Sequence, residues 1–111
     1  MASRPKKSTG ISITYEVLFR PHAERQLIDT ARYYQGKADG LGVKFIGAVD
    51  KISDFIEHSP KIYPVCHDDF RRAHVTGFPY SLYFRIQEQT IWVYAILSQR
   101  MDLGKIRAAL T

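Results

Sequence analysis

Basic and aromatic side chains gather in the last third of this 111-residue chain. Residues 71–107 contain six lysines and arginines against two acidic residues, whereas residues 11–70 contain seven basic and nine acidic residues. Arginine can bind phosphates or carboxylates, and tyrosine can stack on a base or fill a protein interface. The residues that could do this chemistry are Arg71, Arg72, His74, Tyr83, Arg85, Tyr94 and Arg100. The pattern predicts a basic surface for an anionic or acidic partner, and leaves open whether that surface cleaves RNA or docks on a protein.

Other kinds of site are not indicated by the sequence. It has no glycine-rich loop of the Walker or dinucleotide-binding type. The run Cys66–Asp69 contains metal-ligand residue types, but four adjacent side chains rarely point inward together. We therefore interpret this run as a polar loop leading into a strand, and expect no metal and no cofactor.

Cysteine content and hydropathy bear on the compartment. Cys66 is the single cysteine, so no internal disulfide can form, and we expect a reducing, cytoplasmic compartment. No apolar run approaches the roughly 20 residues that a membrane helix needs. We expect no membrane association.

The apolar periodicity predicts one domain over residues 11–111, preceded by a flexible basic leader at residues 1–10. Alternation over residues 11–20 predicts a strand. Helical spacing predicts helices over 22–37 and 45–58, and the connection between them is so short that they must be antiparallel neighbours.

Alternation returns after residue 70 and predicts strands over 71–75, 80–86 and 91–97. A helix capped by Asp102 is expected to follow, with Leu103, Ile106 and Leu110 on its apolar edge. The order β-α-α-β-β-β-α predicts an α+β fold in which a small antiparallel sheet packs against the N-terminal αα-hairpin. The arginines and tyrosines are then expected on the other face of the sheet. The side chains interpreted as core are Tyr80, Phe84 and Trp92, and those expected to share one face of the last strand are Ile91, Val93, Ala95 and Leu97.

Several segments in this order resemble the RelE/ParE superfamily of toxins from bacterial type II toxin–antitoxin systems. These segments are Tyr15–Pro21 followed by Ala23, the helix hairpin, Phe78–Ile86, Ile91–Ile96 and Arg100. The strand FPYSLYFRI resembles the ParE-like branch, and the similarity covers roughly residues 13–107. The resemblance implies a RelE/ParE-like fold and a plasmid-stabilising toxin that a cognate antitoxin neutralises.

The two branches of the superfamily imply different targets. RelE-like members are ribosome-dependent mRNA endonucleases, whereas ParE-like members are regarded as DNA gyrase inhibitors without a cleavage set. Ser81 stands where the RelE pattern has an arginine, and no tyrosine follows Tyr94. The resemblance therefore implies a ParE-like gyrase inhibitor that acts by binding rather than as an enzyme.

Two alternatives stay open. Arg72 and His74 could replace two basic residues of the RelE set, which would give an altered ribosome-dependent mRNA endonuclease; the other alternative is a non-toxic binding module. The catalytic set for the endonuclease would be Arg72, His74, Arg85 and Arg100. The target-binding set for a gyrase inhibitor would be Arg71, Arg72, Tyr83, Arg85, Tyr94 and Arg100. Of the histidine and paired arginines that many ParE-like relatives carry after the last strand, this chain matches only Arg100.

Overall fold

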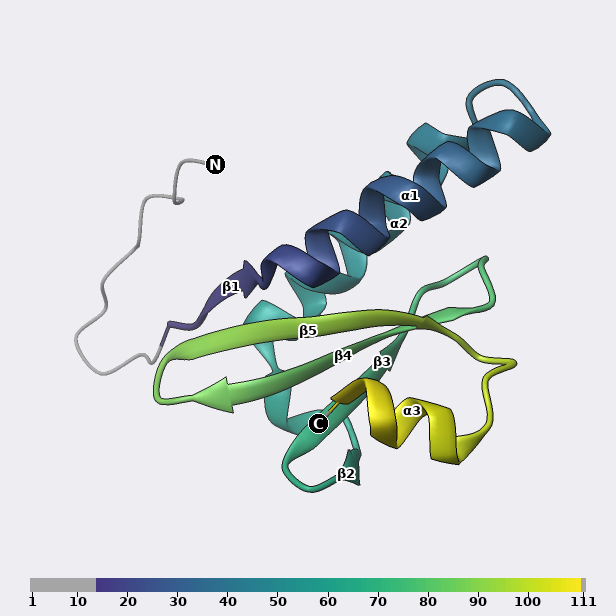
Figure 1. The fold of residues 1–111 in the computed structure, drawn as a ribbon. Helices are drawn as coiled ribbons and strands as arrows, with labels where there is room; N and C mark the ends of the chain where they lie inside the picture. Colours follow the sequence, from purple (N-terminus) through teal and green to yellow (C-terminus); the bar gives the residue numbers. More distant parts are fainter. Residues whose placement is uncertain (1–13, 111) are drawn as a thin grey trace.

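The computed structural model describes residues 14–110, in which helices cover both faces of one sheet (Figure 1). The elements in chain order are β1 (Glu16–Phe19), α1 (Pro21–Lys37), α2 (Leu41–His58), the 3-10 turn η1 (Pro60–Ile62), β2 (Val65–His67), β3 (Phe70–His74), β4 (Tyr80–Gln87), β5 (Thr90–Ser98) and α3 (Leu103–Leu110). The predicted α+β class, helix hairpin and C-terminal helix are confirmed. The predicted leader lies outside the described residues.

The sheet is mixed, with strand order β1-β5-β4-β3-β2. β1 runs parallel to β5, so that Glu16 pairs with Thr90 and Phe19 with Val93. The other pairs are antiparallel, as tight connections require. The sequence predicted a wholly antiparallel sheet because alternation reveals a strand but not the direction of a neighbour that is distant in the chain. The short edge strand β2 was also not predicted.

The tip of the helix hairpin is held by a side chain and by a close helix contact. Gly40 precedes α2 with φ +85°, a conformation that glycine adopts without strain. The Gln35 side-chain oxygen accepts hydrogen bonds from the backbone N–H groups of Gly40 (3.1 Å) and Gly42 (3.2 Å). A Cβ at Gly42 would lie 2.6 Å from the Ala31 carbonyl oxygen, so the two helices approach each other closely here.

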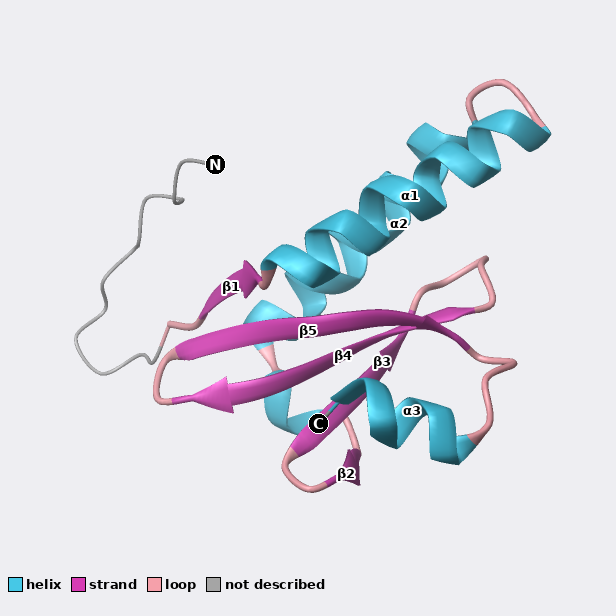
Figure 2. Cartoon of the chain, viewed as in Figure 1, coloured by secondary structure: helices cyan, strands magenta, loops and turns pink. Residues whose placement is uncertain are grey.

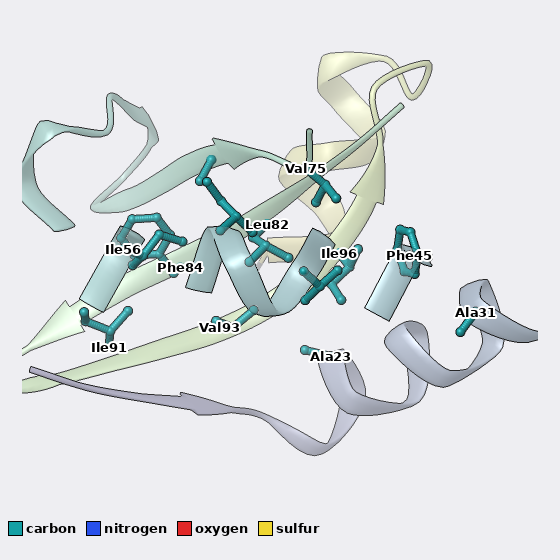
Figure 3. Packing of buried hydrophobic residues seen from close by; sticks show 13 residues of the cluster. Ala23, Ala31, Phe45, Ile56, Val75, Leu82, Phe84, Ile91, Val93 and Ile96 are labelled. Carbon is teal, nitrogen blue, oxygen red and sulfur yellow. The ribbon is translucent and has the colours of Figure 1, made fainter. Parts of the chain in front are cut away.

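The main core lies between the hairpin and the sheet (Figure 3). Phe45 and Ile56 of α2 are fully buried there against Leu82 and Phe84 of β4. The opposite face of the sheet carries α3 (Figure 2). Its smaller cluster contains Phe70, Tyr83, Ala95, Leu97, Ile106 and Leu110. The core assignment is confirmed for Phe84, and Tyr80 is half-buried but packs against the main core. Trp92 is half-buried and belongs to neither cluster.

A β-bulge in β5 changes which of its side chains face each of the two clusters, compared with the predicted alternation. Tyr83 pairs with Ala95 and Phe84 pairs with Val93, so Tyr94 is an extra residue in β5. Val93 therefore belongs to the main core, whereas Ala95 belongs to the cluster under α3. The prediction that Ile91, Val93, Ala95 and Leu97 share one face was wrong, because one inserted residue reverses the alternation.

Among the helices described for residues 14–110, none combines the length and apolar character needed to cross a bilayer.

Candidate interaction surfaces

The structure separates Arg71 from the other residues of the predicted site. Arg72 pairs with Tyr83 across the strands, whereas Arg71 pairs with Phe84 and so belongs to the hairpin face. Arg71 Nη1 donates hydrogen bonds to the carbonyl oxygens of Tyr63 (2.6 Å) and Lys61 (3.1 Å). These bonds attach the end of η1 to β3, which is a structural role.

Arg72, His74 and Tyr83 lie together in a groove of about 600 Å³ between the sheet and α3, which we call the α3 groove. The full lining is Tyr63, Pro64, Arg72, His74, Ser81, Tyr83, Gln99, Met101, Leu103 and Ile106. The Gln99 amide hydrogen-bonds His74 Nδ1 (2.5 Å). Burial raises the pKa of Tyr83, and its hydrogen bond with Arg72 only partly offsets that rise. The Tyr83 phenol therefore stays neutral and forms a hydrogen bond with Arg72.

Beside the α3 groove, cations and aromatic rings alternate in a row that we call the arginine ladder: Phe70, Arg85, Tyr94, Arg20 and Trp92. The Arg85 guanidinium lies 4.2 Å from the Phe70 ring centre and 5.2 Å from that of Tyr94. The Arg20 guanidinium lies 5.0 Å from the Tyr94 ring centre and 5.6 Å from that of Trp92. These are cation–π distances, so the ladder is a partly preorganised surface.

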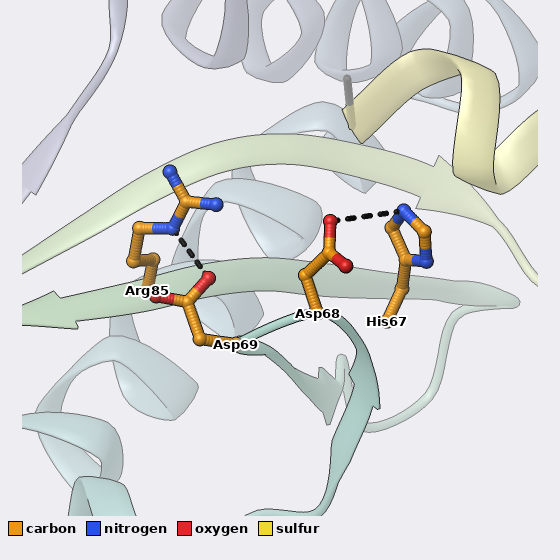
Figure 4. Close-up of polar contacts among 4 residues, drawn as sticks. All are labelled: His67, Asp68, Asp69 and Arg85. Carbon is orange, nitrogen blue, oxygen red and sulfur yellow. Dashed lines mark hydrogen bonds and ion pairs between the residues drawn. The ribbon is translucent and has the colours of Figure 1, made fainter.

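Asp69 holds Arg85 in the ladder. Arg85 Nε donates to Asp69 Oδ1 at 2.7 Å (Figure 4). Burial lowers the pKa of Arg85, but hydrogen bonds with Asp69 and Tyr94 raise it by more. Arg85 therefore stays charged and already has a carboxylate partner.

The third surface is a hollow of about 420 Å³ between the hairpin tip and the ends of β4 and β5, which we call the tyrosine hollow. Its lining is Tyr33, Tyr34, Lys37, Leu41, Pro79, Tyr80, Ser98 and Arg100. Ser98 and Arg100 line this hollow, while Gln99 and Met101 line the α3 groove. Arg100 is therefore on the side of the sheet away from Arg72 and His74.

The run Cys66–Asp69 forms the end of β2 and the turn into β3. His67 Nε2 lies 3.4 Å from Asp68 Oδ2 (Figure 4), and Asp69 is engaged with Arg85. Over residues 14–110, no three histidine, cysteine or acidic side chains converge in a way that could hold a metal ion. Burial raises the pKa of Cys66 and the nearby Arg72 offsets this only in part, so the thiol is not an activated nucleophile.

Taken together, the predicted ribonuclease residues do not meet at one point. Arg72 and His74 share the α3 groove, Arg85 is stacked in the ladder, and Arg100 lines the tyrosine hollow. Acid–base cleavage needs a proton donor, a base and charge stabilisation around one reacting group. The arrangement supports binding over several surfaces better than catalysis at a single site.

Sequence reasoning missed Arg20 and the tyrosine hollow. Arg20 reaches Tyr94 because β1 is parallel to β5, with the Arg20 N–H donating to the Val93 carbonyl (2.9 Å). Alternation could not reveal that pairing. The pair Tyr33 and Tyr34, followed by Lys37 just before the glycine-containing turn, was a usable signal for the hollow.

Comparisons with known proteins identify relatives. The family described as "ParE toxin of type II toxin-antitoxin system, parDE" matches residues 17–103. Nine chains of solved structures match. One, described as "Chromosomal ParDE TA system from P. aeruginosa", is 15% identical with a TM-score of 0.68, over 78% of this chain and 98% of that chain. No protein with a curated description matches significantly.

Proposed function

The chain belongs to the ParE toxin family of type II toxin–antitoxin systems, and from that premise we propose that it inhibits DNA gyrase by binding and that a cognate antitoxin neutralises it in the cytoplasm. The family match carries this proposal, because it runs from β1 to the first residue of α3 and so includes most residues of all three surfaces.

The arginines and the tyrosine that share one face of the sheet support inhibition by binding. Arg72 in the α3 groove and Arg85 and Tyr94 in the ladder face the same side of the sheet, next to one another. Arginine and aromatic residues carry most of the energy of protein interfaces. We propose Arg72, Arg85 and Tyr94 as target contacts, with Tyr83 supporting Arg72. Arg100 would extend the contact beyond the strand end.

The antitoxin would bind as a helix and a strand wrapped around this domain. Exposed apolar side chains on the hairpin offer a helix-binding surface, and β1 and β2 are sheet edges with unpaired backbone groups. The exposed hairpin side chains are Ile28, Val43, Ile46 and Phe55. The basic sheet face favours an acidic partner. Co-expression with the neighbouring open reading frame should give a stable complex and restore growth; a lack of both would contradict this part.

The target is tested by two assays on the purified chain. We expect inhibition of gyrase supercoiling, with Arg72→Ala and Arg85→Ala losing about tenfold or more in potency. Arg25→Ala removes an equally charged, exposed side chain from α1 and should leave potency unchanged.

The α3 groove favours one alternative, a ribosome-dependent mRNA endonuclease, because Arg72, His74 and Tyr83 are together there. Codon-positioned cuts in mRNA on translating ribosomes, abolished by His74→Ala, would replace the gyrase proposal. Absence of such cuts together with gyrase inhibition is the expected result.

A further inference from the structure

We propose that the tyrosine hollow binds a nucleotide, with the phosphate between Lys37 and Arg100 and the base against the tyrosine rings. This goes beyond the proposed function, because the hollow is on the hairpin side of the sheet and Arg100 is the one lining residue also proposed above as a target contact. The nucleotide could be free or at the end of a nucleic acid strand, since both present the same phosphate and base.

The lining of the hollow is rich in hydrogen-bond donors and contains no carboxylate. The donors are the hydroxyls of Tyr33, Tyr34, Tyr80 and Ser98, the Lys37 ammonium and the Arg100 guanidinium. Ser98 Oγ accepts from the Arg100 backbone N–H (3.1 Å), which leaves its hydroxyl hydrogen available. Within residues 14–110, neither Lys37 nor Arg100 forms an ion pair. A donor-rich, acid-free site with two unpaired cations selects an oxyanion such as phosphate.

Tyr34 lies close enough to three of the other polar groups to interact with them electrostatically. Burial raises the pKa of Tyr34, the neighbouring Tyr80 and Tyr33 raise it further, and Arg100 lowers it. Tyr34 therefore lies within electrostatic reach of all three. At neutral pH its phenol is protonated and is available as a donor to an anion.

The aromatic part of the lining favours a base in addition to the phosphate. Tyr33 is 56% exposed, and its ring lies 5.1 Å from Lys37 Nζ. Tyr34 and Tyr80 are half-buried, with ring centres 6.2 Å apart, and both pack on Phe45. Aromatic rings beside cations suit a planar base, because every base has a face that can stack on an aromatic ring. About 420 Å³ is too large for a phosphate alone and falls in the range of small-ligand sites.

The hairpin tip holds this lining in place without a ligand. Gln35 caps the first turn of α2 through Gly40 and Gly42, next to Leu41 in the lining. Phe78 packs on Tyr34 at 4.9 Å and on Phe45 at 5.1 Å, and so fixes the position of the turn before β4. A preorganised site loses less free energy to ordering when its ligand binds.

The test is a titration of the purified full chain, isotope-labelled for NMR, with adenosine 5′-monophosphate, adenosine, inorganic phosphate and a 5′-phosphorylated tetrathymidylate. We expect saturable binding of adenosine 5′-monophosphate below about 1 mM, at least about tenfold tighter than adenosine or inorganic phosphate. Amide shifts should centre on residues 33–41, on Tyr80 and on residues 98–100. If the oligonucleotide binds more tightly than adenosine 5′-monophosphate, the ligand is the end of a nucleic acid strand. If it binds equally or more weakly, the ligand is a free nucleotide.

Matched variants make the outcome specific. Lys37→Ala and Arg100→Ala should each weaken binding about tenfold. Lys105→Ala and Arg25→Ala remove exposed positive charges elsewhere and should change it less than about twofold. Circular dichroism of each variant checks that it is folded. Four outcomes would each overturn the proposal. They are amide shifts centred on the α3 groove, equal affinity for phosphate and nucleotide, displacement of the nucleotide by an acidic hexapeptide that binds more tightly, and equal effects of all four substitutions.

Discussion

Gly42 and Gly47 form a matched pair in α2 for testing how the hairpin is held together. Both are helical, so alanine should gain about 1 kcal/mol of helix propensity at either position. A Cβ at Gly47 would meet nothing within 4 Å. A Cβ at Gly42 would lie 2.6 Å from the Ala31 carbonyl oxygen and 3.0 Å from Gln35 Cβ.

These distances give opposite signs for the two substitutions. Gly47→Ala should stabilise the fold by about 1 kcal/mol, which is about 4–8 °C in Tm for a domain of this size. At Gly42 the backbone oxygen cannot move without shifting α1, and overpacking of this kind costs about 1–3 kcal/mol. Gly42→Ala should therefore be destabilising by up to about 2 kcal/mol after the propensity gain is counted.

Thermal and urea unfolding, followed by circular dichroism, measure both effects on the same chain. We expect the Tm to rise for Gly47→Ala and to fall for Gly42→Ala. Equal stabilisation by the two substitutions would refute the close helix approach and with it the fixed geometry of the hairpin tip beside the tyrosine hollow.

Three further predictions concern the sheet and α3. Arg71→Ala should lower the free energy of unfolding by about 1–2 kcal/mol, because two carbonyl groups lose their donor; Arg107→Ala, on an exposed face of α3, should change it by less than about 0.5 kcal/mol. Hydrogen exchange should be faster in α3 than in β4, and faster again with Asp102→Ala, since Asp102 Oδ1 caps the Lys105 N–H (2.9 Å). Cys66 should be alkylated more slowly at pH 8 than a cysteine in an unstructured peptide, because its raised pKa leaves less thiolate. Arg72→Ala should slow the reaction further, because the nearby Arg72 lowers that pKa.

The helices were the most predictable part of the fold. α1 and α2 each carry an apolar stripe at helical spacing, and the few residues between them allow only an antiparallel hairpin. Asp102 was recognisable as a cap, and Ile106 and Leu110 of α3 are buried as expected. Leu103 was expected to join them and is 63% exposed instead. The stripe identifies a helix, but sequence does not show where along it the contact with the sheet begins.

The parallel strand pair was less predictable. Alternation in β1 fixes which side chains share a face, but the partner of β1 is some seventy residues away in the chain. No local signal encodes such a pairing, because its stability comes from packing in the finished sheet. Arg20 therefore looked like the last residue of a strand, although it stacks on Tyr94 and Trp92 in the folded protein.

The bulge at Tyr94 determines which of the basic residues can lie together in one site. Simple alternation from Trp92 would have put Arg100 on the same face as Arg72 and Arg85, as the sequence suggested. The extra residue in β5 reverses the alternation up to the strand end, so Ser98 turns to the tyrosine hollow. In the turn that follows, Gln99 hydrogen-bonds His74 and Arg100 lines the hollow. A single cleavage site would need Arg100 beside Arg72, whereas here the two arginines line different surfaces. The same single residue that removes Arg100 from a candidate catalytic set thus supplies the second cation of the tyrosine hollow.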